Sequence, residues 1–163
     1  MVRKKSTGQK VAKTADPDKP LKDNVKEPCG RAVHADPNAP PSVEQKPLPT
    51  EIAQKPLEQK SPAEWAYERL ILYIQNFEEQ LDDEHEVAVG FAAGSAGVLR
   101  IEGVGFFDPD IVTFYGSDEL GGRSQLIQHV TQLSVTLRAI PKMVSEDEPR
   151  RIGFRLAADL KGD

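Results

Sequence analysis

The sequence predicts an α+β fold in which one N-terminal helix packs on a mainly antiparallel sheet of five to six short strands, behind a disordered tail. Three observations carry this prediction. The composition of the 163-residue chain changes sharply near residue 60, a helical spacing of apolar residues follows Ser61, and apolar residues alternate with period two from residue 87 onward. Strands that follow one another without intervening helices pair mostly antiparallel.

The change in composition separates a tail from a domain. Residues 1–60 hold 9 of the 13 prolines, none of the ten aromatic residues, and 12 Lys and Arg against 8 Asp and Glu. Such a segment cannot bury enough apolar surface to offset the entropy of ordering its backbone. Residues 61–163 hold every aromatic residue and carry a net charge of −9. We therefore predict a disordered tail over residues 1–60 and one α+β domain over residues 61–158, which is long enough to bury a core.

The tail contains two features that a partner could recognise. Residues 45–48, Gln-Lys-Pro-Leu, recur as residues 54–57, which fits either a pair of docking motifs or drift in a linker. A basic cluster could also contact nucleic acid through electrostatic attraction. Its members are Arg3, Lys4, Lys5, Lys10 and Lys13.

The cellular compartment is expected to be the cytoplasm. Cys29 is the only cysteine, so no intrachain disulfide forms, which suits a reducing compartment. The basic N-terminus is followed by no apolar stretch of the kind that a secretory signal requires, and no apolar run is long enough to span a membrane.

The domain is expected to begin with a helix at Ser61. The sequence Ser-Pro-Ala-Glu at residues 61–64 is a capping box with proline at the first helical position. Apolar residues then recur at helical spacing, which predicts a stripe facing a core and a helix end near Asp82. We expect Trp65 and Phe77 to anchor that core. The stripe consists of Tyr67, Leu70, Ile71, Ile74, Phe77 and Leu81.

After this helix the pattern predicts strands and tight turns. Alternation and β-branched content favour strands at residues 87–91, 98–102 with an extension to 107, and 111–115. Glycine, proline and aspartate predict turns at residues 93–97 and 108–110 and a loop at 116–123. Gly103 and Gly105 indicate a β-bulge or a close approach of two backbones.

Residues 124–140 are predicted to form one long strand, and residues 151–156 a last short one. A helix is the alternative for residues 124–140, because Leu126, Val130, Leu133 and Leu137 would share one side of it. The β-branched content of the segment favours the strand. One face would then carry Ile127, His129 and Leu133, and the other face the polar residues from Gln128 to Arg138.

Several strings in the domain resemble an uncharacterised bacterial family known only as a domain of unknown function. They are the Ser-Pro-Ala-Glu-Trp-Ala run at residues 61–66, Phe-Tyr-Gly at 114–116, Leu-Ile-Gln-His-Val-Thr-Gln-Leu at 126–133 and Arg-Ile-Gly-Phe at 151–154. The resemblance covers most of residues 61–156. It implies a small soluble domain that is bacterial or bacteriophage-associated, and it implies no activity, cofactor or catalytic residue.

The predicted function is that of a non-enzymatic binding or interaction module. A single helix covers only one face of a sheet, so the other face is open to a protein or a small ligand. Amides, hydroxyls and one arginine around a tyrosine suit directional hydrogen bonding at an interface. The candidate binding residues are Tyr115, Gln128, His129, Gln132, Thr136 and Arg138. The alternative is a small-molecule sensor or a small enzyme with a pocket near Tyr115 and His129.

Other chemistries find less support in the sequence. His85 lies in an acidic run whose side chains fan outward from a helix end, so no metal site is expected there. Asp108 and Asp110 flank a proline and read as turn residues. The net charge of −9 argues against nucleic-acid binding by the folded domain. We predict no catalytic residue, no metal ligand and no cofactor.

Overall fold

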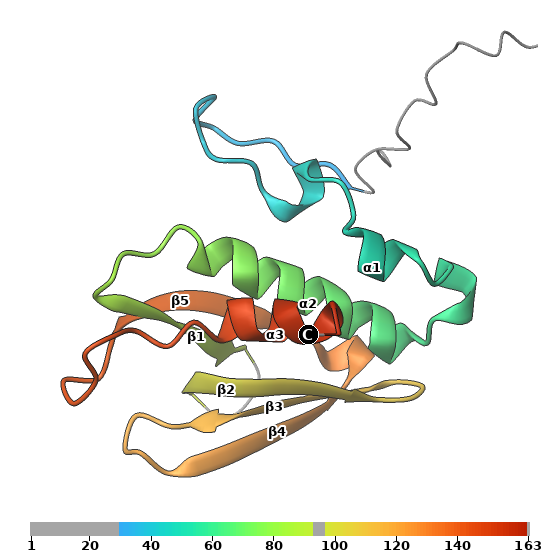
Figure 1. Ribbon diagram of the computed structural model, residues 1–163. Helices are drawn as coiled ribbons and strands as arrows, with labels where there is room; N and C mark the ends of the chain where they lie inside the picture. The colour runs from blue at the N-terminus through green and yellow to red at the C-terminus, as the bar shows by residue number, and fades with distance from the viewer. Residues whose placement is uncertain (1–29, 93–96, 163) are drawn as a thin grey trace, which may run out of the picture.

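The computed structural model describes residues 30–92 and 97–162 of the chain (Figure 1). It contains one five-stranded antiparallel sheet in the order β4-β3-β2-β1-β5, with helices α2 and α3 side by side on one face. The predicted α+β class and the antiparallel sheet are confirmed. The elements are η1 Val43–Gln45, α1 Thr50–Ala53, η2 Leu57–Gln59, α2 Pro62–Glu78, β1 His85–Phe91, β2 Val98–Phe107, β3 Ile111–Ser117, β4 Arg123–His129, η3 Val130–Gln132, β5 Val135–Pro141 and α3 Ile152–Leu160.

Helix α2 begins where the sequence predicts. The hydroxyl oxygen of Ser61 accepts a hydrogen bond from the backbone N–H of Glu64 at 3.0 Å, which satisfies one of the free donors of the first turn. The helix ends at Glu78, four residues before the predicted end at Asp82. Beyond it, the Asp82 carboxylate accepts from the N–H of Glu84 at 2.9 Å, a local turn that competes with helical hydrogen bonding.

The core lies between α2, α3 and one face of the sheet. Val112 and Phe114 of β3 are fully buried there, and Phe91 of β1 meets Phe114 edge to face with ring centroids 4.9 Å apart. Phe77 is half-buried and packs at the margin of this cluster. Trp65 lies outside the cluster, beneath the Lys60 ammonium and the Arg69 guanidinium. Trp65 therefore packs beside the core, not within it.

Residues 124–140 are not one strand, so that prediction is wrong. They form β4, the turn η3 and β5, and the two strands lie at opposite edges of the sheet. The break is local: Thr131 N–H donates to the His129 ring, and the Gln132 amide oxygen accepts from the backbone N–H of His129. This capping closes a turn, and Val130 and Leu133 then pack beside the first turns of α2. A strand of about 17 residues would also exceed the usual length of 5–6.

The predicted strand at residues 151–156 is also wrong, because this segment is the start of α3. Ile152, Leu156 and Leu160 follow a helical spacing and pack on the core, whereas the intervening Phe154 is 45% exposed. The two helices approach closely at Gly153, where a Cβ atom would lie 2.8 Å from the backbone of Gln75. The apolar alternation of a six-residue run fits either element, and contact with α2 decides in favour of the helix.

Glu78, the last residue of α2, caps α3 from outside. Its side chain is buried at 1% exposure, and Oε2 accepts from the backbone N–H of Phe154 at 3.1 Å. Burial raises the pKa of Glu78 above its ordinary value of 4.5, although the N–H groups of the first turn of α3 oppose this shift. A raised folded pKa means that the folded state favours the protonated form. The resulting stabilisation is complete below the ordinary pKa and is lost as pH rises through the folded pKa.

The Glu78→Gln variant should therefore be more stable than the natural protein at neutral pH. Glutamine keeps a carbonyl oxygen for the Phe154 N–H and removes the buried charge, a gain on the order of 1 kcal/mol. The gain should shrink as the pH falls through the raised pKa of Glu78, because the buried glutamate itself then becomes neutral. Urea unfolding followed by Trp65 fluorescence at several pH values measures both quantities. A variant that is less stable than the natural protein at neutral pH, by an amount that shrinks as the pH is lowered, would show that the negative charge is a net stabilising cap.

Part of the predicted tail packs against the domain. Residues 43–60 form three short helical turns, and Ile52 among them is 2% exposed. Lys60 donates to the backbone oxygen of Ile52 and to the Glu68 carboxylate, each at 2.5 Å. Residues 43–60 were predicted to be disordered, and the structure differs over this range. Hydrogen bonds and ion pairs with α2 supply the stabilisation that the low apolar content of the segment does not.

Both copies of the repeated Gln-Lys-Pro-Leu sequence contact α2 or the residue after it. The Lys46 ammonium donates to Asn76 at 2.7 Å and pairs with Glu79 at 3.2 Å, and the Lys55 ammonium pairs with Glu64 at 2.7 Å. The repeat therefore places two cations along the same helix. Residues 1–29, with Cys29 and the basic cluster, and residues 93–96 of the predicted turn lie outside the described residues.

Candidate functional site

The face of the sheet opposite the helices is the candidate site. Because successive side chains of a strand alternate between faces, burial of Val112 and Phe114 against the helices places Thr113 and Tyr115 on the open side. The antiparallel register extends this face to the neighbouring strands: Ile127 of β4 lies opposite Thr113. The open face thus runs from β4, through β3 and β2, to β1 and β5.

Tyr115 covers the part of this face that β2 contributes. A Cβ atom at Gly103 would lie 3.5 Å from the Tyr115 ring, and one at Gly105 would lie 2.8 Å from the Thr113 hydroxyl oxygen. The glycines therefore leave the space that the neighbouring side chains of β3 occupy. The pairing of β2 with β3 also shifts register between Ile101 and Gly103. The predicted bulge or close backbone approach at these glycines is confirmed.

An apolar patch on the open face spans β2, β3 and β4. We define it as Phe107, Tyr115 and Ile127, whose exposed fractions are 75%, 44% and 62%. Phe106 pairs with buried Val112, so it lies on the helix side of the sheet. Its neighbour Phe107 pairs with Ile111 and therefore lies on the open side. Exposed apolar side chains that gather on one surface are a feature of protein interfaces and ligand grooves.

His129 lies at the end of β4 within a hydrogen-bonded turn. Its Nε2 is 3.0 Å from the Asp110 carboxylate, and its Nδ1 is 2.7 Å from the Thr131 hydroxyl oxygen. The carboxylate favours the tautomer with hydrogen on Nε2, which leaves Nδ1 to accept from the N–H of Thr131. The side chain of His129 is 42% exposed. The arrangement locks the turn between β4 and η3 and fixes the orientation of the imidazole.

The other predicted binding residues are scattered by the fold. Thr136 and Arg138 do lie on the open face, opposite Gly90 and Ala88 of β1, but two strands separate them from Tyr115. Gln132 belongs to the η3 turn and caps His129. Gln128 pairs with Val112 and is 7% exposed on the helix side, so its predicted place on the open face is wrong. Ile127 takes the open side instead, because β4 and β5 are separate strands with independent faces.

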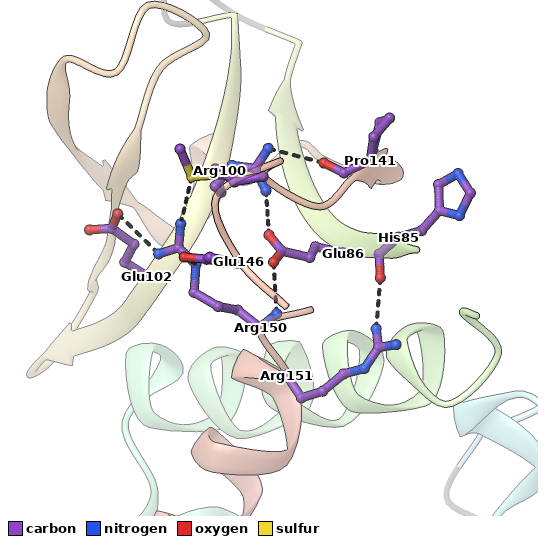
Figure 2. A network of polar contacts seen from close by, with 9 residues as sticks. His85, Glu86, Arg100, Glu102, Pro141, Glu146, Arg150 and Arg151 are labelled. Carbon is purple, nitrogen blue, oxygen red and sulfur yellow. Dashed lines mark hydrogen bonds and ion pairs between the residues drawn. The ribbon is translucent and has the colours of Figure 1, made fainter. Parts of the chain in front are cut away.

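A second polar cluster lies where β1 and β2 diverge (Figure 2). The two strands pair only from Ala88 to Gly90, and the buried Glu86 carboxylate occupies the fork below. It accepts hydrogen bonds from the Arg100 guanidinium and, at 2.7 Å, from the backbone N–H of Arg150. Arg100 also donates to the carbonyl oxygen of Pro141 at 3.2 Å. One carboxylate thereby joins β1, β2 and the segment that enters α3.

Two of the cavities lined by the described residues lie beside the helices, and neither is lined by Tyr115 or His129. One of about 440 Å³ lies at the start of α2 and contains Trp65, Val130 and Leu133. The other, of about 380 Å³, lies between β2 and the start of α3 and contains Ile101 and Arg155. Within residues 30–92 and 97–162, no group of three or more His, Cys, Asp and Glu side chains could hold a metal ion. In the same ranges no helix combines the length and the apolar character needed to cross a bilayer.

Sequence reasoning missed Phe107 and Ile127 as surface residues. Phe107 follows Phe106 directly, and only one of two neighbours in a strand can face a core that covers a single side. The face that Ile127 occupies follows from its pairing with β3, because the loop of residues 118–122 fixes the register of the β3–β4 hairpin. The signal for Phe107 was therefore present in the sequence, whereas that for Ile127 required the pairing partner.

Comparison with known proteins gives a family but no activity. Searches of curated proteins and of solved structures returned no match. A family model described as a family of unknown function, DUF6173, matches residues 56–155. The match begins within the segment that packs along α2 and reaches into α3, so it includes the whole sheet. The chain belongs to this family of unknown function, DUF6173.

Proposed function

We propose that this domain is a protein-interaction module that binds an extended segment of a partner protein along the outer edge of β4. The observation that carries the proposal is the exposure of Ile127, the β4 member of the apolar patch, on a strand whose outer edge is unpaired. The partner strand would add main-chain hydrogen bonds to β4, and its alternate side chains would contact the patch.

The outer edge of β4 has the properties of a pairing site. The backbone of residues 123–128 pairs with β3 on one side, and no other segment of the described chain pairs with it on the other side. Natural edge strands are usually protected by proline, lysine or a bulge. Strand β4 carries none of these, and Arg123 at its first position is its only Asp, Glu, Lys or Arg residue. The opposite edge strand, β5, contains Arg138 and ends at Pro141.

The patch suits the side chains of an incoming strand. Ile127 belongs to β4 itself, so a residue opposite it on an added strand would contact its exposed methyl groups. Tyr115 lies one strand further in, with its ring over the glycines of β2, and His129 stands at the end of the β4 edge. Thr136 and Arg138, on the far side of the face, would then contact a partner only if it covers the whole sheet.

The proposal is tested with peptides and one charge-introducing substitution. Twelve-residue peptides, a length of about 40 Å when extended, are selected by display against the full chain, and amide hydrogen exchange locates the site. We expect protection of residues 123–128. The Ile127→Lys variant should bind the selected peptide at least about tenfold more weakly, because a charge would be buried at the edge.

The matched control is Thr136→Lys, which places the same charge on the same face but at the opposite edge strand. It should leave peptide affinity unchanged. Protection confined to other residues, or equal affinity of the Ile127→Lys variant, would refute the proposal. Dimerisation of the natural chain that Ile127→Lys abolishes would also refute it, since the occupant of the edge would then be a second copy.

A further inference from the structure

The cavity between β2 and the start of α3 is positively charged, in a domain that is otherwise acidic. Three arginines and one glutamate line it, for a net charge of +2, while residues 61–163 together carry −9. Two isoleucines supply the apolar part of its wall. The lining residues are Ile101, Glu102, Arg150, Arg151, Ile152 and Arg155.

The three arginine side chains differ in the hydrogen bonds and ion pairs that they already form. Arg151 donates to the backbone oxygens of His85 at 2.9 Å and Asp82 at 2.6 Å, which fixes its position. Arg150 forms ion pairs with Glu102 at 3.6 Å and with Glu146 at 3.4 Å, and its guanidinium donates to the Met143 sulfur at 3.5 Å. Arg155 is exposed, and its guanidinium has no hydrogen bond or ion pair within the described part of the chain. One guanidinium is thus free, and the other two have partners.

Arg150 also contains an unused donor. Its Nε is buried, and no acceptor among the described residues receives a hydrogen bond from it, although Glu146 is within ion-pair distance. A buried donor without a hydrogen-bonded acceptor costs free energy, and the nearby Glu146 carboxylate offsets part of that cost. Figure 2 shows the Arg150 side chain extending from beside Glu86 toward Glu102 and Glu146.

The placement of these cations opposes the field of α3. Arg150 and Arg151 precede the helix and Arg155 lies near its first turn, where the helix dipole favours negative charge, and the first turn contains no acidic residue. The Glu78 carboxylate compensates in part from the other side, through the N–H of Phe154. A second anion among the arginines would relieve the remaining repulsion.

We propose that this cavity binds a small organic phosphate monoester. The planar guanidinium fork of the unpaired Arg155 matches the geometry of phosphate oxygens, and Arg150 and Arg151 add positive charge to the lining. The volume of about 380 Å³ lies within the range of small-ligand sites, and Ile101 and Ile152 would contact an apolar body attached to the phosphate. This site lies on the helix side of the sheet, so it is independent of the β4 edge.

The test uses phenyl phosphate as the probe, with the full chain. Calorimetry gives the affinity, and amide chemical shifts report the site. We expect saturable binding, with shifts concentrated at Ile101, Ile152 and Arg155, and at least tenfold weaker binding by the Arg155→Gln variant. Arg155 has no partner in the fold, so this variant should keep the melting temperature of the natural protein.

The control is Arg123→Gln, which removes an exposed arginine from β4 and lowers the net charge equally. It should bind phenyl phosphate with unchanged affinity. Equal weakening in both variants would show a general effect of net charge and would overturn the proposal. So would binding that does not saturate, or inorganic phosphate that binds as tightly as phenyl phosphate, since the latter would leave no role for the isoleucines.

Discussion

Replacing Glu86 with alanine is expected to lower the free energy of unfolding by about 3–5 kcal/mol, because breaking a buried ion pair leaves the other charge without its partner. The Glu86 side chain is 1% exposed, and its two oxygens accept from the Arg100 guanidinium and the Arg150 N–H. The substitution therefore removes contacts that join β1, β2 and the segment before α3. Urea unfolding followed by circular dichroism measures the change.

A double-mutant cycle separates the ion pair from the other contacts of Glu86. The Arg100 side chain is 19% exposed, so water can reach it once the carboxylate is gone. The Glu86→Ala, Arg100→Ala double variant should therefore be more stable than the sum of the two single changes predicts. Glu86→Gln, which keeps an acceptor for the Arg150 N–H, should lose less than Glu86→Ala. A loss below about 1 kcal/mol for Glu86→Ala would show that the fork between β1 and β2 does not depend on this carboxylate.

The Phe114→Ala variant should lose about 3–5 kcal/mol, because it removes a fully buried ring and leaves a cavity. Phe114 is 0% exposed, and its edge-to-face contact with Phe91 joins β3 to β1 above the central strand β2. A loss of this size is comparable with the total stability of many small domains. We expect a steep fall in melting temperature, measurable by calorimetry.

The adjacent residue of the same strand provides the control. Tyr115 is 44% exposed on the open face, so Tyr115→Ala should cost less than about 1 kcal/mol. If the two variants lost similar stability, both faces of the sheet would be buried in solution and the open face would not be free for a ligand. The pair of measurements therefore tests the assignment of faces on which the proposed function rests.

The sequence alone determined the elements whose signals are local. The start of α2 follows from Ser61 and Glu64, three residues apart, and strands β1 to β3 follow from alternation between tight turns. The turn at residues 108–110 and the bulge near Gly103 also depend on a few adjacent residues. In each case the residues that decide the conformation are neighbours in the chain, so a short window contains the whole cause.

The tertiary structure decided what depends on distant partners. Residues 151–156 could alternate as a strand or turn as a helix, and packing on α2 through Gly153 selected the helix. Residues 43–60 were too polar to fold by themselves, and the pairs of Lys46, Lys55 and Lys60 with residues of α2 and its C-terminal end place them on the domain.

The candidate site shows the same division. Alternation along the strand puts Thr113 and Tyr115 on the face opposite Val112 and Phe114. The structure agrees, because Val112 and Phe114 are buried against the helices. The identity of the patch did not follow, because the face that Ile127 occupies depends on its register with Thr113, and the position of Thr136 depends on pairing with β1. A shift of one residue in register moves every side chain of a strand to the other face. The chain therefore encodes which segments are strands, whereas contact between strands remote in sequence decides which residues share a surface.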